Sequence, residues 1–290
     1  MSCQKKYILF GAGFEGIGVL HTLGKDSVAF FCDNFAEEDR IEDIPVIDFS
    51  ILKDIFSDYR VVVSVTNSAV VDEICKLLED NQIPYVFPVN VYREKQLSLS
   101  RIKHEEELRY WDKLHDWNTS INYKDEILYL AGKDDDTFLA GKVVADFGCG
   151  PLGTLAWTDK PLVKLGIDVL AARYGEAFLK GKLAEHGMVY VTSTEKCIPI
   201  PDNYVDCIIT MNSLDHVENL EQMCAELKRI LKPGALLLGD FNLLERETAC
   251  EPQTLTEGIL KEVLLDDFEI EMYRIVESNG LRLRVRGKYR

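Results

Sequence analysis

One short stretch, VVADFGCGPLG at residues 143–153, combines an acidic residue with three glycines at a spacing that suits the binding of a nucleotide-sized ligand. Asp146 ends an apolar run of the kind that a parallel sheet buries on both faces. Gly148, Gly150 and Gly153 follow within a few positions, so the backbone can adopt positive φ and a ligand can lie close to it. Amide groups at the start of the next helix would point toward that ligand. The stretch therefore predicts a binding slot at the end of a buried strand.

A second acidic residue, Asp168, stands near the end of another apolar run, VKLGIDV at residues 163–169. It follows the first acid by roughly 20 positions, and in nucleotide-binding α/β sheets an acid near this offset accepts hydrogen bonds from the ribose hydroxyls. The two acids and the glycines together predict a site for an adenosyl group.

These residues make the sequence resemble the class I S-adenosylmethionine-dependent methyltransferases. Asp146, Gly148 and Gly150 match the acidic, glycine-rich first motif of that family, and Asp168 matches its second-strand acid. Residues 197–238, from CIPIPDNY to LKPGALLL, match its later motifs in order. The order and spacing of several motifs make this a far more specific signal than a glycine turn alone.

The resemblance covers roughly residues 141–290, about half of the chain. It implies S-adenosylmethionine as the cofactor and a doubly wound α/β domain whose seven-stranded sheet ends in an antiparallel hairpin. One departure is Leu152, which stands where many members have a third glycine and has Gly153 beside it. Gly153 is therefore included among the expected cofactor-binding residues.

Further cofactor contacts are expected at the ends of the third and fourth strands of this domain. Thr194 and Glu195 occupy the segment that holds the adenine edge in the family. Asn212 and Ser213 follow the predicted fourth strand at residues 206–211, where strand ends face the ligand crevice of a parallel sheet. Both are expected to contact the methionine part of the cofactor, and the structural alternative for Ser213 is to cap the following helix.

His216 is the titratable residue best placed for chemistry, because it follows the same strand end and imidazole exchanges protons near neutral pH. With a hydroxyl acceptor, His216 would act as the general base, oriented by Asp215 or by Glu245. The polar loop that contains Glu245 also contains Glu251. The alternative for His216 is a histidine at a helix start with only structural hydrogen bonds. No spacing of histidines and carboxylates in the sequence indicates a metal site, so none is expected.

The first ninety residues contain a second glycine motif. Gly11, Gly13 and Gly16 form GxGxxG between a predicted strand and a helix, and Asp33 follows the next strand, as in a dinucleotide-binding fingerprint. This segment resembles the small Rossmann-like domains found beside sugar-modifying enzymes in bacterial surface-polysaccharide pathways. Two interpretations stay open, because the glycines either hold a nucleotide or pack the helix on the sheet in a domain that serves structure or docking.

Composition divides the chain into three segments: a Rossmann-like nucleotide-binding or docking domain at 1–90, a helical linker or cap at 91–140, and the methyltransferase domain at 141–290. Both flanking segments are expected to be doubly wound α/β domains. The middle segment has an apolar stripe at helical spacing. Its aromatic residues Tyr110, Trp111 and Trp117 either line a pocket or pack the helix against the next domain.

Charge and hydropathy limit the partners of this protein. The net charge of −16 opposes contact with phosphate backbones and anionic lipid, so neither nucleic acid nor a membrane is an expected partner. The basic C-terminal stretch LRLRVRGKYR alternates apolar and polar residues, which predicts a strand with one solvent-facing side. No apolar run approaches the roughly 18 residues of a spanning helix, and no signal-peptide pattern is present, so a cytoplasmic location is expected.

The sequence as a whole predicts the transfer of a methyl group from S-adenosylmethionine to a small-molecule acceptor, and the N-terminal resemblance suggests a sugar or sugar nucleotide. One alternative is a nicotinamide-dependent oxidoreductase built on the N-terminal GxGxxG motif, which lacks an evident hydride-transfer residue of its own. Another is a non-catalytic scaffold that keeps a cofactor for stability. Assembly into a homo-oligomer is left open by the sequence.

Overall fold

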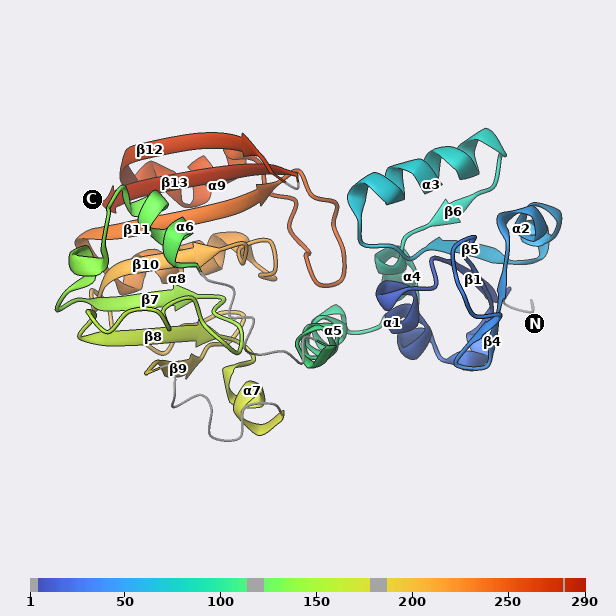
Figure 1. The fold of residues 1–290 in the computed structure, drawn as a ribbon, viewed down its shortest axis with the longest axis horizontal. Coiled ribbons are helices and arrows are strands. Elements are labelled where there is room, and N and C mark those ends of the chain that lie inside the picture. Colours follow the sequence, from blue (N-terminus) through green and yellow to red (C-terminus); the bar gives the residue numbers. More distant parts are fainter. Residues whose placement is uncertain (1–4, 114–122, 178–186, 279) are drawn as a thin grey trace. The chain divides into compact units, whose positions relative to one another are not determined.

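The computed structural model describes residues 5–113, 123–177, 187–278 and 280–290, and the chain forms two compact units (Figure 1). The first unit runs from Met1 to Glu106 and the second from Glu107 to Arg290. The division falls within helix α5 (Leu99–Lys113). Each unit has its own sheet and its own hydrophobic core.

The N-terminal unit is a six-stranded sheet in the order β3-β4-β2-β1-β5-β6, with β3 antiparallel to β4 and the other pairs parallel. Strand β1 (Tyr7–Phe10) lies near the middle because all four of its residues are apolar and buried. The predicted α/β class of this unit is confirmed. Its remaining elements are α1 (Phe14–Leu23), β2 (Val28–Cys32), β3 (Arg40–Ile41), β4 (Ile44–Ile47), α2 (Phe49–Ile55), β5 (Arg60–Val63), α3 (Ser68–Asp80), β6 (Tyr85–Val86) and α4 (Pro88–Glu94).

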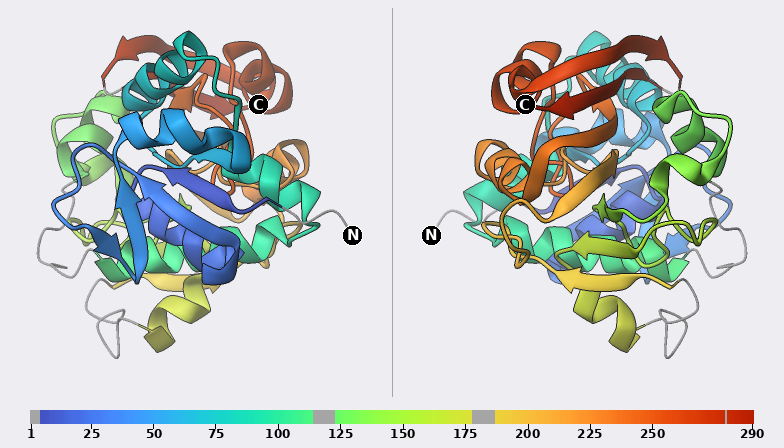
Figure 2. Two further views of the ribbon diagram at one scale, coloured as in Figure 1. Left: turned by 90° about the vertical axis from the view of Figure 1, so that its right-hand side faces the viewer. Right: turned by 90° about the vertical axis from the view of Figure 1, so that its left-hand side faces the viewer.

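The C-terminal unit is a seven-stranded sheet in the order β12-β13-β11-β10-β7-β8-β9. Strands β7 to β11 pair in parallel, and β13 runs antiparallel to both β11 and β12. The predicted seven-stranded sheet with a terminal hairpin is therefore confirmed, and β12 and β13 lie side by side at one edge (Figure 2). Its strands are β7 (Val143–Phe147), β8 (Val163–Asp168), β9 (Val189–Thr192), β10 (Val205–Met211), β11 (Leu231–Leu243), β12 (Phe268–Glu277) and β13 (Leu281–Tyr289).

Helices cover both faces of this sheet because the side chains of its central strand alternate between two cores. Ala145 and Phe147 of β7 share one core with helices α8 (Leu220–Ile230) and α9 (Glu257–Val263). Val144 belongs to the other core, which contains residues of helix α6 (Lys124–Ala131). A short helix, α7 (Ala171–Ala177), follows β8.

Strand β7 is flanked by β8 on one side and by β10 on the other, so the direction of the strand order changes beside it. In open α/β sheets, ligands bind at the carboxyl ends of the strands at such a switch point. The ends of β7, β8 and β10 are therefore where this fold provides a crevice.

The arginine side of β13 is not solvent-facing as the alternation had predicted. Arg282 Nε lies 2.8 Å and Arg284 Nε 3.1 Å from the carboxylate of Asp240, which is fully buried. Arg284 also pairs with Glu126 of helix α6 at 2.6 Å. The prediction was wrong for these arginines because α6, from a distant part of the sequence, packs against Arg284 and Arg286.

Over the residues that the structure describes, every helix is too short or too polar to cross a membrane.

Candidate active site

Three glycines in left-handed backbone conformations form the turn that follows β7. The φ angles are 70° at Gly148, 57° at Gly150 and 67° at Gly153, a region that other residues enter at a cost. A Cβ atom at Gly148 would lie 2.2 Å from Cβ of Ser213, and one at Gly153 would lie 2.3 Å from Sδ of Met188. Glycine is therefore required here both by the backbone and by close neighbours.

The predicted residues at the end of β10 lie directly beneath this turn. Ser213 is buried, donates to the carbonyl oxygen of Phe147 at 2.9 Å and lies 2.8 Å from the hydroxyl of Thr210. These bonds tie the end of β10 to the end of β7. Asn212 has a φ of 53°, and its side-chain Oδ1 is buried without a hydrogen-bond partner among the described residues. Ser213 thus supports the turn, while Asn212 offers an unused acceptor.

Asp146 is buried near the carboxyl end of β7. Its Oδ2 accepts a hydrogen bond of 2.6 Å from the amide of Thr154, whereas its Oδ1 has no partner among the described residues. Burial raises the pKa of Asp146 to about 7, although the bonds from Thr154 oppose this shift. An ionised carboxylate with one unpaired oxygen is costly in such a place, and residues kept in this state are commonly found where a ligand binds.

This cost leads to a prediction for Asp146→Asn. Because the pKa of Asp146 is raised on folding, the folded protein keeps a proton that the unfolded chain releases, and wild-type stability falls as pH rises through the window from about 4 to about 7. The variant has no titrating group at this position. We measure the free energy of unfolding of both proteins by urea unfolding at pH 5 and at pH 8. The value for Asp146→Asn minus the value for wild type should be more positive at pH 8 than at pH 5. An equal difference at the two pH values would contradict this account of Asp146.

Asp168 lies at the end of β8 and holds the glycine turn through its carboxylate. Its Oδ2 accepts from the amide of Gly150 at 3.0 Å, and its Oδ1 accepts from the amide of Leu170 at 2.8 Å. Burial raises the pKa of Asp168 to about 6, and the two amide bonds partly offset that effect. Each carboxylate oxygen can accept a second hydrogen bond, so the side chain retains the capacity to bind hydroxyl groups.

His216 lies among three carboxylates after the end of β10. Its Nδ1 is 2.7 Å from Oε1 of Glu107, and its Nε2 is 3.9 Å from Oδ1 of Asp215 and 4.0 Å from Oε1 of Glu251. Asp215 is almost fully buried, and burial raises the pKa of Asp215 and of Glu251. The structure therefore brings together two predicted residues, His216 and Asp215, with two that were not assigned to the site.

The surroundings of His216 do not suit the expected role of a general base. Burial lowers the pKa of His216, but the hydrogen bond to Glu107 and the charges of Glu107, Asp215 and Glu251 together raise it to about 9. The imidazole is therefore protonated at neutral pH in this state. Oε1 of Glu245, the other residue expected to orient His216, lies beside Gly280, 2.9 Å from where a Cβ there would be.

The sequence indicated Glu251 more clearly than Glu107 as a residue near the site. Glu251 was noted as a charged residue of the polar loop after β11, and that loop is anchored here by a 3.1 Å bond from the amide of Gln253 to the carbonyl oxygen of Asp215. Glu107 lies on α5 one helical turn before Trp111, next to the apolar stripe predicted for this segment. An acid beside such a stripe was the only local signal for it.

Trp111 packs over the glycine turn. A Cβ atom at Gly150 would lie 2.8 Å from Cζ2 of the indole, and Trp111 also packs on a buried cluster formed by Leu108, Leu170 and Tyr174. The part of α5 in the C-terminal unit thus covers the turn, and Trp117 lies outside the described residues.

The two residues expected at the adenine edge both accept hydrogen bonds from backbone amides. The hydroxyl oxygen of Thr194 accepts from the amides of Lys196 and Cys197 at 3.2 and 3.0 Å. The carboxylate of Glu195 accepts from the amide of Glu218 at 3.3 Å. Thr194 therefore shapes its own turn, and Glu195 joins the β9 end to the segment after β10.

In the N-terminal unit, packing contacts account for two of the three motif glycines. A Cβ atom at Gly16 would lie 2.1 Å from the carbonyl oxygen of Gly11, and one at Gly11 would lie 2.7 Å from the carbonyl oxygen of Ser64. Asp33 accepts hydrogen bonds from the amides of Ala12 and Phe35 at 3.0 and 2.9 Å. A Cβ at Gly13 would meet no described atom within 4 Å, so that glycine is open to its surroundings.

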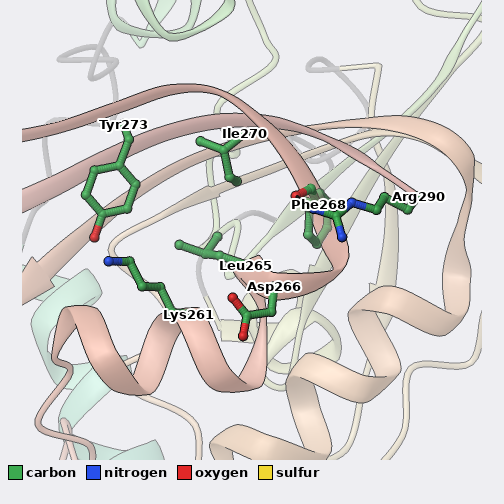
Figure 3. A pocket seen from close by; sticks show the side chains of 7 residues that line it. All are labelled: Lys261, Leu265, Asp266, Phe268, Ile270, Tyr273 and Arg290. Carbon is green, nitrogen blue, oxygen red and sulfur yellow. Dashed lines mark hydrogen bonds between the residues drawn. The ribbon is translucent and has the colours of Figure 1, made fainter.

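A shallow surface hollow of the C-terminal unit lies elsewhere, between α9 and the start of β12 (Figure 3). Lys261 Nζ lies 5.2 Å from the ring centre of Tyr273 there. The hollow contains none of the predicted site residues, so it is distinct from the crevice. It is lined by Lys261, Leu265, Asp266, Phe268, Ile270, Tyr273 and Arg290.

Residues 145–239 match the protein-family model described as the methyltransferase domain. This range runs from β7 into β11 and includes the glycine turn, Asp168 and His216. The region that matches this model contains the carboxyl ends of β7, β8 and β10.

Among curated proteins, the chain is similar to the ubiquinone/menaquinone biosynthesis C-methyltransferase of Francisella philomiragia, with 31% identity over 134 residues, 45% of this chain and 48% of that protein. The chain spans about half the length of the curated relatives it matches first. Among solved structures, it is similar to the N-methyltransferase NodS of Bradyrhizobium japonicum in complex with S-adenosyl-L-homocysteine, with a TM-score of 0.50, 14% identity, and coverage of 64% of this chain and 98% of that one. At this identity, the likeness shows a shared fold.

Proposed function

We propose that this chain, with its methyltransferase domain, transfers a methyl group from S-adenosylmethionine to a small-molecule acceptor. The observation that carries the proposal is the buried carboxylate of Asp146, whose Oδ1 has no partner among the described residues and which stands at the base of a turn of left-handed glycines. Buried polar atoms in folded proteins nearly always have partners, so an orphaned acceptor at a strand end indicates a ligand that donates to it.

The donor and acceptor groups at the crevice fit the parts of this cofactor. Asp168 would accept from the ribose hydroxyls through lone pairs that the amide bonds leave available. The unpartnered Oδ1 of Asn212 would accept from the methionine ammonium group. Gly148 and Gly150 allow the ligand to approach the backbone closely. When bound, the cofactor supplies a methyl group that is already activated by its sulfonium centre.

The contribution of the chain to the reaction is mainly positional. Holding an acceptor in line with the methyl group contributes roughly 7 to 11 kcal/mol when the geometry is productive. Trp111, packed on Gly150, would exclude water from that side of the turn. His216 is protonated in this state, so it would not remove the proton of an acceptor oxygen.

For the acceptor, we propose a sugar or sugar nucleotide. The support is the N-terminal Rossmann-like sheet with its glycine motif, of which Gly13 has open space around it. The contacts of Gly11 and Gly16 equally support a packing or docking role for that motif. Mass spectrometry of nucleotides that co-purify with the full chain, followed by an acceptor screen that measures S-adenosylhomocysteine formation, tests the proposal. A chain that binds the cofactor but turns over no acceptor would instead be a scaffold.

The oxidoreductase alternative is not favoured. The family match falls on the C-terminal unit, and the carboxylate of Asp33 already accepts two backbone amides. Titration of the full chain with NAD separates the two functions, because the oxidoreductase requires NAD binding and the methyltransferase does not.

Asp168→Ala should weaken the binding of S-adenosylhomocysteine by about 10- to 150-fold, because the ribose hydroxyls lose a charged acceptor worth about 1.5 to 3 kcal/mol. Calorimetry of the full chain measures the change. Asp266→Ala, which removes an exposed aspartate beside the distant hollow, is the control and should bind like wild type. Normal affinity in the folded Asp168→Ala protein would remove this residue from the cofactor site.

A further inference from the structure

We propose that Asp215, His216 and Glu251 form a binding site for one divalent metal cation of the Mn²⁺ or Zn²⁺ type. Their potential ligand atoms, one imidazole nitrogen and two carboxylate oxygens, all lie within 4.8 Å of one another. Nε2 of His216 is 3.9 Å from Oδ1 of Asp215 and 4.0 Å from Oε1 of Glu251. A point central to three atoms at such separations lies about 2.3 to 2.5 Å from each, close to the ~2.0–2.2 Å of zinc bonds to nitrogen and oxygen.

The buried carboxylate of Asp215 points to a ligand independently of this clustering. The residue is only 1% exposed, and neither of its carboxylate oxygens has a hydrogen-bond partner among the described residues. Two orphaned oxygens on one buried side chain are expensive for a folded protein. One of these oxygens faces His216, so a cation held there would satisfy it.

Glu107 provides the support that a metal-binding histidine normally has. Nδ1 of His216 lies 2.7 Å from Oε1 of Glu107, so the ring donates to a carboxylate on one side and turns Nε2 toward Asp215 and Glu251 on the other. Carboxylates in this position fix the orientation of the imidazole and strengthen it as a ligand. In many protein metal sites, a carboxylate accepts a hydrogen bond from a histidine whose other ring nitrogen binds the metal, and His216 has this arrangement.

The loop after β11 holds the third ligand in place. The amide of Gln253 donates to the carbonyl oxygen of Asp215, and the side-chain amide of Gln253 donates to the carbonyl oxygens of Val217 and Glu218 at 3.1 Å each. The amide of Glu251 donates to the hydroxyl of Thr248 at 2.9 Å. These bonds fix the loop on the segment after β10, which keeps Glu251 beside the other two residues.

The site has an accessible side, because the side chain of Glu251 is 34% exposed and that of His216 is 29% exposed. Three protein ligands leave coordination positions for water or for another oxygen ligand. A hydroxyl-bearing acceptor would fill those positions. This acceptor role rests on the proposed methyl transfer, whereas the binding of the metal cation does not depend on it.

The test is titration of the chelator-treated full chain with Mn²⁺, followed by electron paramagnetic resonance and calorimetry in the absence of cofactor and acceptor. We expect one Mn²⁺ per chain, displaced by Zn²⁺. Glu251→Gln, at a partly exposed position, should weaken binding by at least 10-fold, and Asp215→Asn should do the same. Glu262→Gln removes an exposed carboxylate of α9 and should leave Mn²⁺ binding unchanged.

Absence of stoichiometric Mn²⁺ and Zn²⁺ binding to the wild-type chain would overturn the proposal. So would binding that Glu251→Gln and Asp215→Asn, shown to be folded by circular dichroism, leave as tight as in wild type. Neither outcome depends on methyl transfer, so failure of the metal site is distinguishable from failure of the proposed function.

Discussion

Asp240→Asn should lower the free energy of unfolding of this protein by about 3 kcal/mol, because removing one partner from a buried ion pair leaves the other charge uncompensated. Asp240 is fully buried, and both of its oxygens are bound to arginines of β13. Arg282 and Arg284 are only 21% and 22% exposed in their side chains, so water cannot replace the lost carboxylate fully. Arg284 keeps Glu126 as a partner in the variant. The expected loss in the free energy of unfolding is therefore at the lower end of the range for buried ion pairs.

Thermal and urea unfolding measure this effect, and for a unit of this size a loss of 3 kcal/mol corresponds to a fall in Tm of roughly 6 to 12 °C. Glu271→Gln is the matched control. It breaks contacts of Glu271 with Arg286 and Lys288, but its side chain is 31% exposed and that of Lys288 is 54% exposed, so a loss below about 1 kcal/mol is expected. Equal effects of the two variants would show that the Asp240 cluster adds nothing beyond a surface pair.

Gly148→Ala should destabilise the C-terminal unit and reduce cofactor affinity together. The left-handed backbone at this position costs about 1 to 2 kcal/mol for a residue with a Cβ atom. The overlap with Cβ of Ser213 adds roughly 1 to 3 kcal/mol, because that residue is buried and bonded to both strand ends. The overlap can be relieved only if the glycine turn or Ser213 moves. Either movement would separate the end of β7 from the end of β10.

Gly234→Ala separates the two causes. Gly234 has a φ of 80°, yet a Cβ atom there would meet no described atom within 4 Å. This control should show the backbone cost alone and bind S-adenosylhomocysteine normally. Urea unfolding and calorimetry of both variants give the comparison, and a Gly148→Ala protein that matches Gly234→Ala in both measurements would mean that contact with Ser213 does not shape the crevice.

Much of the fold could be predicted because its signals are local. The apolar run of β7 and the glycines after it are decided by backbone conformation and burial, which depend on residues adjacent in the chain. The order of these motifs along the chain carried the family resemblance, and that resemblance implied the seven-stranded sheet that ends in a hairpin.

Side-chain partners could not be predicted in the same way, because packing of distant elements decides them. The arginines of β13 have the spacing of a solvent-facing strand side, and only the position of α6 places Glu126 and Asp240 against them. Spacing along a strand shows which residues share a face, but not what covers that face.

The strand ends, the glycine turn and the positions of Asp146, Asp168 and His216 were determined by the sequence itself, since a few neighbouring residues fix each of them. The state of His216 was decided by the tertiary structure alone. Glu107 from α5 and Glu251 from the loop after β11 meet the imidazole there, and their negative charges hold the pKa of His216 at about 9. Electrostatic interactions depend on distance in space rather than on separation in sequence, so only the folded chain makes this histidine a cation between carboxylates.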